Sequence, residues 1–444
     1  MSNITTNTTQ DNLINILNDN WREGYTIPSA RLYPFQWNWD SGFIALGLSY
    51  YAPERAIEEI RSMFKGQWSN GMLPHIVFHK QNENYFPGPE VWSLHKTNNA
   101  PKNLPTSGIT QPPVFGFIIE RMHTHMSAYK GWLDFLEEIY PKIYEYHKYL
   151  YNNRDPLNEG LVYIQHNWES GTDNSPIWDD IFENMDVTNA RDVSHLRKDN
   201  KNVDASERPT NENYKRYINL IDIFVDCNYD DKLISEKSPF LVQDVLFNSM
   251  LVKSNSGLIN IGKLLNKDVS EILAWNAKSI KAINEKLWDE VSGFYYAFDL
   301  KANKRISIKV SSGFMPLFAG TCSASQANKL VSHLKKSFQK TPDWHLCASC
   351  AFTEAAFNPV KYWRGPVWIN VNWMIYHGLI SYGFAEEGNM VKQDSVALIE
   401  NSGSFEYFDP RPDNEVNQKR GIGADLFSWT AALYLDFTLN KQNS

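Results

Sequence analysis

Two consecutive stretches near the middle of the chain decide the fold class: residues 240–265, FLVQDVLFNSMLVKSNSGLINIGKLL, and residues 268–287, DVSEILAWNAKSIKAINEKL. In both stretches apolar residues recur with the period of a helix, and no strand-like segment lies between them. Alternating helices without intervening strands favour an all-α toroid over a βα barrel. The same period predicts further helices over residues 9–21, 40–50, 53–65, 114–127, 130–152, 212–226, 324–337, 364–381 and 424–438.

Strand signals are few. The segments Gly293–Phe298 and Ile306–Val310 predict at most a small β hairpin beside the helices. Three long segments interrupt the helical pattern, at about residues 80–112, 180–211 and 399–423, and loops of this length in a compact domain are usually functional. Because no Pro- or Gly-rich linker divides the chain, we expect one domain over residues 1–444 with these loops on one face.

The second of these loops is mostly polar from Asn189 to Asn213. A polar segment of this kind is typical of a lid that closes over a site. A plain disordered insertion has the same composition, and the sequence leaves both interpretations open.

The composition indicates a folded protein with an unusual supply of aromatic surface. Hydrophobic residues make up 42% of the chain and charged residues 21%, which is enough for a sizeable core. The 15 Trp and 22 Tyr residues provide flat, amphipathic faces of the kind that bind sugars. The net charge of −8 argues against a nucleic-acid partner, whereas a neutral or small anionic substrate fits it.

The chain shows no sequence signal for a membrane or a metal. Met1–Asn18 lacks the basic start and apolar stretch of a signal peptide, and no run of about 18 apolar residues follows, so we expect a cytoplasmic protein without a membrane partner. Cys347 and Cys350, with His345 just before them, have the spacing of half a metal site. No second such pair follows, so we expect buried thiols and no metal or other cofactor.

Hydrolysis of a glycosidic bond with inversion needs one carboxylic acid to protonate the leaving oxygen and one carboxylate to activate water. A first candidate segment is YPFQWNWDSGF, residues 33–43. Asp40 in this segment has two interpretations that the sequence does not separate. It is either the N-cap of the following helix or an acceptor for sugar hydroxyls, with Trp39 and Tyr33 as an apolar wall.

The second candidate segment is HNWESGTDNSPIWDD, residues 166–180. Helix capping explains at most one or two of its carboxylates, so the segment is better explained by function. A carboxyl held between Trp168 and Trp178 should have a raised pKa, as a general acid requires. The carboxylates of this segment are Glu169, Asp173, Asp179 and Asp180.

The third segment, GSFEYFDP at residues 403–410, sets Glu406 among aromatic residues on a non-helical stretch. The alternative is an ion pair of Glu406 with Arg411 or Arg420. A fourth segment, YWRGPVWIN at residues 362–370, opens a helix with three aromatic side chains. Trp residues at helical spacing are more often core, but these flank the turn, where ligands reach.

Together these segments resemble the clan of trehalases and the α-glucosidases of glycoside hydrolase family 63, and within it the bacterial and plant glucosylglycerate and mannosylglycerate hydrolases. The motifs QWNWDSGF, GITQPPV, WESGTDNSPIWD, ERPTNENY, YWRGPVWIN and FEYFDP occur in family order between residues 33 and 430. The resemblance implies an (α/α)6 barrel, an inverting mechanism and no metal.

Position by position, the resemblance implies that Asp173 is the general acid and Glu406 the general base. Thr172 departs from the family, which usually has an aromatic residue before the acid. The resemblance also implies a pocket for the cleaved sugar, formed by Asp40, Trp39, Tyr33, Gln111 and Trp168. It further implies that Tyr362, Trp363 and Trp368 provide an aromatic lining and that Arg208 and Tyr214 reach an acidic aglycone.

The expected reaction is hydrolysis of the α-glycosidic bond of glucosylglycerate or mannosylglycerate to a hexose and D-glycerate, with glucose preferred over mannose. Arg208, Arg411 and Arg420 lie in loops expected to overhang the cavity, where a bidentate guanidinium suits a glycerate carboxylate. The alternatives are an α-glucosidase acting on a neutral sugar such as trehalose or kojibiose, a catalytically silent sugar-binding protein, and a phosphorylase or lyase. The sequence is also compatible with a homo-oligomer.

Overall fold

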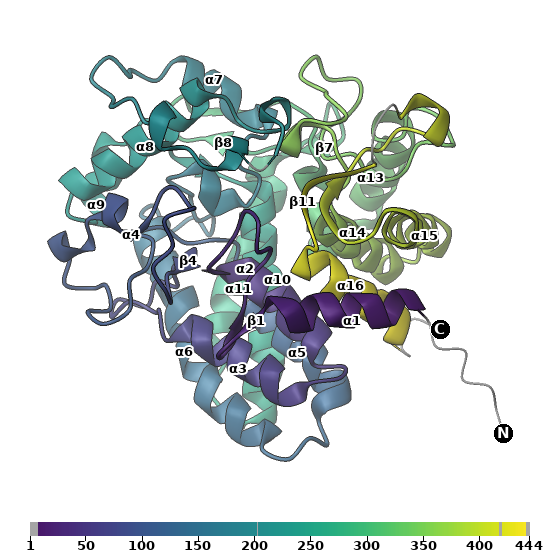
Figure 1. Cartoon of the computed structure of the whole chain (residues 1–444), viewed down its shortest axis with the longest axis horizontal. Helices are drawn as coiled ribbons and strands as arrows, with labels where there is room; N and C mark the ends of the chain where they lie inside the picture. The colour runs from purple at the N-terminus through teal and green to yellow at the C-terminus, as the bar shows by residue number, and fades with distance from the viewer. Residues whose placement is uncertain (1–7, 202, 417–419, 441–444) are drawn as a thin grey trace.

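The computed structural model describes residues 8–201, 203–416 and 420–440. The expectation of no signal peptide therefore rests partly on residues 1–7, outside the described ranges. The described chain is mostly helical (Figure 1). Its helices are α1 Thr8–Asn20, α2 Asn38–Leu48, α3 Pro53–Phe64, α4 Pro89–Trp92, α5 Phe115–Met126, α6 Trp132–Arg154, α7 Asp179–Glu183, α8 Asn211–Asp226, α9 Asp231–Lys237, α10 Val245–Leu264, α11 Ser270–Ala282, α12 Met315–Ala319, α13 Ala324–Ser337, α14 Ile369–Ser381, α15 Ala385–Ser402 and α16 Ser428–Leu439.

An inner group of helices packs in a closed ring. Within the described residues α2 contacts α5, α5 contacts α10, α10 contacts α12, α12 contacts α14, α14 contacts α16, and α16 returns to α2. Helices α2, α12, α14 and α16 are apolar on nearly every side, and every residue of α2 is buried. A helix that is hydrophobic all round is stable only inside a protein, which explains why these segments form the inner ring.

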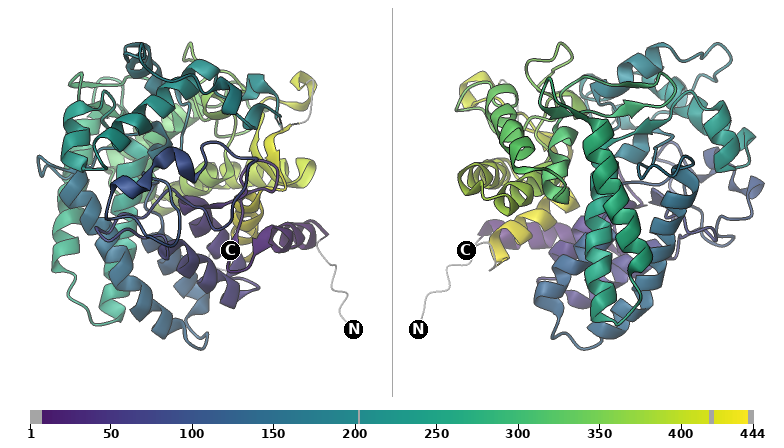
Figure 2. Two further views of the ribbon diagram at one scale, coloured as in Figure 1. Left: turned by 60° about the vertical axis from the view of Figure 1, so that its left-hand side comes forward. Right: turned by 180° about the vertical axis from the view of Figure 1, so that it is seen from behind.

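A second group of helices covers the ring from outside. Helix α3 packs on α2, α6 on α5 and α10, α11 on α10, and α15 on α14 and α16. The α10–α11 pair, formed by the two stretches quoted first, runs side by side when the molecule is seen from behind (Figure 2, right). Helix α1 packs on α16, so helices near the two chain ends meet (Figure 1).

The strands are short and form small antiparallel sheets, β1 with β2, β3 with β4, β5 with β8 and β9, β6 with β7, and β10 with β11. The sequence predicted fewer. The hairpin spans residues 298–305, whereas Ile306–Val310 forms no strand and Val310 only bridges Cys350. The strands are β1 Trp21–Arg22, β2 Tyr25–Thr26, β3 Gln36–Trp37, β4 Ile76–Val77, β5 Val242–Gln243, β6 Trp288–Asp289, β7 Phe294–Tyr295, β8 Phe298–Asp299, β9 Lys304–Arg305, β10 Phe405–Phe408 and β11 Gly421–Asp425.

Helix α15 was missed by the sequence analysis. Its buried stripe includes Gly388 and Ser395, which are small rather than apolar, so the helical period is hard to read. The loop expected over residues 399–423 consequently begins inside this helix, and it contains β10 and the start of β11. The helix predicted from residue 240 begins later, at Val245, because Asp244 caps it by accepting the N–H of Phe247 at 2.8 Å.

The other two loops lack long helices, as expected. Residues 80–112 contain only α4 and a 3-10 turn, and residues 180–211 contain the end of α7 and three 3-10 turns in their described part. None of the helices in the described ranges has the length and apolar composition needed to cross a bilayer.

Candidate active site

A pocket of about 390 Å³ lies where several inner helices begin. Trp39 and Asp40 stand in the first turn of α2, Gln111 precedes α5, and Trp368 caps α14. We call it the inner pocket. Its lining consists of Tyr33, Trp37, Trp39, Asp40, His75, Gln111, Gly171, Asp173, Tyr362, Trp363, Trp368, Glu406, Phe427 and Trp429.

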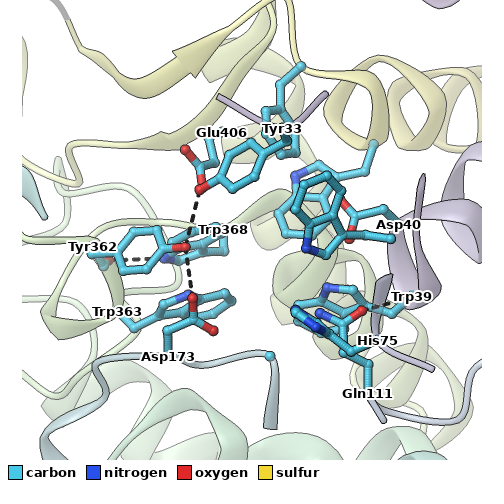
Figure 3. A pocket seen from close by; sticks show the side chains of 14 residues that line it. Tyr33, Trp39, Asp40, His75, Gln111, Asp173, Tyr362, Trp363, Trp368 and Glu406 are labelled. Carbon is cyan, nitrogen blue, oxygen red and sulfur yellow. Dashed lines mark hydrogen bonds between the residues drawn. The ribbon is translucent and has the colours of Figure 1, made fainter. Parts of the chain in front are cut away.

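Asp173 and Glu406 both line the inner pocket and are linked through two tyrosine hydroxyls. Tyr33 donates to Oε1 of Glu406 at 2.7 Å, and Tyr362 donates to Oδ2 of Asp173 at 3.2 Å. The two hydroxyl oxygens are 3.4 Å apart. Figure 3 shows the hydroxyl of Tyr362 between the two carboxyls, with Asp40 across the pocket. Two acids from distant parts of the chain therefore meet in one cavity.

Burial raises the pKa of both carboxyls. The pKa of Asp173 rises to about 7, although Arg208 and the hydrogen bond from Tyr362 act in the opposite direction. The pKa of Glu406 is also raised by burial, and Arg208 and the hydrogen bond from Tyr33 counteract this. Glu406 further accepts the backbone N–H of Ala424 at 3.0 Å. A pKa of about 7 lets Asp173 hold a proton near neutral pH, as a general acid requires.

Arg208 belongs to the polar loop at residues 180–211 and lies beside Glu406. Its guanidinium donates to the hydroxyl of Tyr33 at 3.1 Å, lies 3.8 Å from Oε1 of Glu406, and stacks over the ring of Tyr362 at 4.3 Å. Its side chain is only 5% exposed. Glu406 has no ion pair with Arg411 or Arg420, because Arg411 pairs with Asp409 and Arg420 with Asp413. Neither of these two arginines lines the pocket, contrary to expectation.

Asp40 is not a helix cap. It is the third residue of α2, whose N-cap is Trp37, and its carboxyl faces the pocket. Burial raises the pKa of Asp40 well above its ordinary value, and the nearby Glu406 and Asp173 raise it further. Gln111 is oriented by the backbone N–H of Trp39, which donates to its Oε1 at 3.2 Å. The pocket therefore offers polar groups on the side opposite the two catalytic candidates.

The aromatic residues form packed walls rather than isolated contacts. Trp363 and Trp368 stack with ring centroids 3.7 Å apart and an interplanar angle of 5°.

Two glycines stand against the side chains of the pocket. Gly171 has a φ of +73°, and a Cβ there would lie 2.6 Å from the ring of Trp39. Gly423 also has a φ of +73°, and its Cβ would lie 2.5 Å from Oε2 of Glu406. Both positions therefore require glycine, for conformation and for space.

A buried ion pair between Arg154 and Glu169 anchors the loop that carries Asp173. Arg154 of α6 donates to both oxygens of Glu169, at 3.1 and 3.2 Å, and Glu169 also accepts the backbone N–H groups of Thr110 and Gln165. Glu169 is fully buried and does not line the inner pocket. Its contacts hold the loop that precedes Asp173.

A second pocket, of about 520 Å³, adjoins the first, and we call it the outer pocket. Asp173, Tyr33, Trp37 and His75 line both pockets, so Asp173 stands at their junction. The other lining residues of the outer pocket are Leu32, Asn84, Tyr85, Phe86, Trp168, Lys198, Asp199, Arg208 and Tyr214. Trp168 thus lines the outer pocket and not the inner pocket, where the other residues expected beside the cleaved sugar lie.

Several lining residues were not expected from the sequence. Trp37 stands inside the segment at residues 33–43, and Phe427 and Trp429 lie in the helix predicted over residues 424–438, so these three stood in or beside the segments already singled out. His75 gave none: burial lowers its pKa well below the ordinary value, and its Nδ1 has no hydrogen-bond partner in the described structure. Thr172 lines neither pocket, and its hydroxyl lies 3.0 Å from that of Ser170.

The remaining candidates for a metal site are buried thiols. Cys347 and Cys350 are free and buried, and burial raises the pKa of both. Among the described residues no group of three or more His, Cys, Asp or Glu side chains is arranged to hold a metal ion.

Comparisons with known proteins agree over nearly the whole chain. The family described as "Mannosylglycerate hydrolase MGH1-like glycoside hydrolase domain" matches residues 33–430. A mannosylglycerate hydrolase from Rubrobacter radiotolerans is 40% identical over 96% of this chain and 95% of its own length. A glucosylglycerate hydrolase from Mycolicibacterium hassiacum is 32% identical over 93% of each chain. The crystal structure of a GH63 mannosylglycerate hydrolase from Thermus thermophilus, in complex with Tris and D-glycerate, superposes with a TM-score of 0.90 at 40% identity, covering 97% of this chain and all of that one.

Proposed function

Because the chain belongs to the mannosylglycerate hydrolase MGH1-like family of glycoside hydrolases, we propose that it cleaves the α-glycosidic bond of glucosylglycerate or mannosylglycerate with inversion. The products are a hexose and D-glycerate. The observation that carries this proposal is the position of Asp173. It lies at the junction of the two pockets, and the hydroxyls of Tyr33 and Tyr362 connect it to Glu406.

The proposed architecture is an (α/α)6 barrel formed by one domain. Support comes from the ring of α2, α5, α10, α12, α14 and α16, with further helices packed outside it. The contact of α1 with α16 brings both ends of the chain into the same body, which supports a single domain.

In the proposed reaction the sugar occupies the inner pocket and the glycerate the outer pocket. Asp173 gives its proton to the glycosidic oxygen as the bond to the anomeric carbon breaks. Glu406 takes a proton from a water molecule, whose oxygen attacks the anomeric carbon from the opposite face. Asp173 leaves the step ionised and Glu406 protonated, and the hexose is released first as the β anomer.

The sugar itself is proposed to be held by both sides of the inner pocket. The carboxyl of Asp40 and the amide of Gln111 accept or donate hydrogen bonds to its hydroxyls, and the stacked Trp363 and Trp368 pack along an apolar face. The unpartnered Nδ1 of His75 offers one more contact at the junction. Exclusion of water from this aromatic enclosure strengthens each polar contact.

The alternative function is hydrolysis of a neutral disaccharide such as trehalose or kojibiose. A second sugar ring would then fill the outer pocket and stack on Trp168 or Tyr214. The presence of Lys198 in the lining of that pocket supports an acidic aglycone instead.

The test is a hydrolysis panel of glucosylglycerate, mannosylglycerate, trehalose and kojibiose, with the first-formed anomer identified by NMR. We expect the two glycosylglycerates to have the highest kcat/KM and the β-hexose to appear before mutarotation. Faster cleavage of trehalose or kojibiose would contradict the proposed substrate. Initial release of the α anomer would contradict inversion.

A further inference from the structure

The outer pocket contains one lysine whose charge nothing in the described structure balances. Lys198 lines this pocket in the lid, ten residues before Arg208 in the chain. The residues that the structure describes include no hydrogen-bond or ion-pair partner for its ammonium group. A cation at the wall of a small-molecule pocket without an anion beside it is the electrostatic complement of an anionic ligand.

The other cation of the outer pocket is already committed. Arg208 donates to Asp199 at 3.4 Å and lies 3.8 Å from Glu406, so two carboxylates share its charge. Asp199 is itself bound by Arg197, which donates to both of its carboxyl oxygens at 3.1 and 2.8 Å. The one anionic lining residue that remains, Asp173, is protonated below its pKa of about 7. The lining therefore keeps one unbalanced positive charge, that of Lys198.

We propose that Lys198 recognises the carboxylate of the aglycone and so selects glycosylglycerates over neutral glycosides. This inference rests on the proposed function. Arg208, which the family resemblance implied for this task, is by contrast held beside the base through Tyr33. Lys198 lies outside the hydrogen-bonded chain of the two catalytic candidates, so its contribution falls on binding rather than on the chemical step.

The test compares two substrates that differ in one group. Glucosylglycerate carries a carboxylate where glucosylglycerol carries a hydroxymethyl group, and both have the same α-linked glucose. In Lys198→Met we expect KM for glucosylglycerate to rise about tenfold with little change in kcat, as for loss of one charge-assisted contact. The kinetics on glucosylglycerol should be unchanged, and Lys198→Arg should restore most of the loss.

Lys215→Met is the matched control, since Lys215 is partly exposed on α8 near the lid and lines neither pocket. It should leave both substrates unaffected. Equal effects of Lys198→Met on the two substrates, or no effect on either, would overturn the inference.

Binding of D-glycerate separates failure of this inference from failure of the proposed function. If the unmodified enzyme hydrolyses no glycosylglycerate, the proposed function is wrong whatever Lys198 does. Calorimetric titration of the unmodified protein, Lys198→Met and Lys215→Met with D-glycerate then still tests the carboxylate site. Weaker binding in Lys198→Met alone supports the inference, and equal binding in all three proteins excludes it.

Discussion

Tyr33 donates its hydroxyl hydrogen to Oε1 of Glu406 across 2.7 Å, and the same hydroxyl accepts a hydrogen bond of 3.1 Å from Arg208. Residue 33 comes from the segment before α2, residue 406 from β10, and residue 208 from the lid. The ionisation of the proposed base therefore depends on three distant parts of the chain. The same arrangement explains why substitutions around the pocket should act through pKa values as well as through contacts.

Substrates with different leaving groups should distinguish the proposed roles of Asp173 as acid and Glu406 as base. Asp173→Asn and Glu406→Gln should each lower kcat on glycosylglycerates by about 10²- to 10⁴-fold, because each removes one proton transfer. An α-glycosyl fluoride needs no protonation of its leaving group. We therefore expect Asp173→Asn to hydrolyse the fluoride at a rate near that of the unmodified enzyme, and Glu406→Gln to remain impaired. Rescue of Glu406→Gln but not of Asp173→Asn would reverse the two roles.

The pH dependence of kcat/KM should have two limbs with identifiable origins. Activity should fall above about pH 7, where Asp173 loses its proton, and fall at low pH, where Glu406 gains one. The hydrogen bond from Tyr362 stabilises the charged form of Asp173, so Tyr362→Phe should move the upper limb to higher pH. Tyr33→Phe should likewise raise the pKa of Glu406 and move the lower limb to higher pH. Because Tyr362 also lowers the pKa of Glu406, Tyr362→Phe should move the lower limb to higher pH as well. The shifts are measured from full pH profiles. Movement of either limb to lower pH in Tyr362→Phe, or an unmoved lower limb in Tyr33→Phe, would refute the assignment.

Arg208→Met should impair all substrates. Arg208 lowers the pKa of both Asp173 and Glu406, so its loss raises both values and leaves a smaller fraction of Glu406 ionised. We expect kcat to fall on glucosylglycerate and glucosylglycerol alike, in contrast to Lys198→Met. A loss confined to glucosylglycerate would show instead that Arg208 acts only on the carboxylate.

Gly423→Ala should displace the base. The new methyl group would lie 2.5 Å from Oε2 of Glu406, in addition to the cost of about 1 kcal/mol for a left-handed residue other than glycine. Gly320→Ala is a matched control, because Gly320 has the same φ of +73° with nothing within 4 Å of its Cβ. Gly423→Ala should lose more stability in thermal unfolding, because its Cβ would also lie 2.5 Å from Cε1 of Tyr407, and it alone should lose kcat at temperatures where both variants are folded. Equal activity in the two would mean that the base tolerates the shift.

The buried network on α16 should dominate stability. Asp436 is fully buried, pairs with Arg121 at 2.6 Å, and accepts hydrogen bonds from Tyr50 and Trp373. Asp436→Asn leaves Arg121 without its anion and should cost about 3–5 kcal/mol of unfolding free energy. The exposed pair of Arg61 with Glu138, also 2.6 Å long, is the control.

Glu138→Gln should cost about 0–1 kcal/mol, since solvent screens the exposed pair. Chemical denaturation of both variants provides the measurement. A similar loss of unfolding free energy in the two variants would indicate that burial does not increase the contribution of the Asp436 network to stability.

The sequence by itself determined the helical class, the positions of most long helices and the segments that carry the site. Periodic apolar residues fix a helix locally. Three short segments combine acids with Trp or Tyr, and in residues 166–180 helix capping explains at most one or two of the carboxylates, so both features can be read without coordinates. Helix α15 was lost because small residues replace apolar ones in its buried stripe.

Only the tertiary structure decided which groups meet. The chain from Glu406 through Tyr33 and Tyr362 to Asp173, the assignment of Trp168 to the outer pocket, and the unbalanced charge of Lys198 depend on how helices far apart in sequence close into a ring. Hydrogen bonds and ionisation respond to distances of a few ångströms and to burial, and neither quantity is encoded in the local pattern of residues.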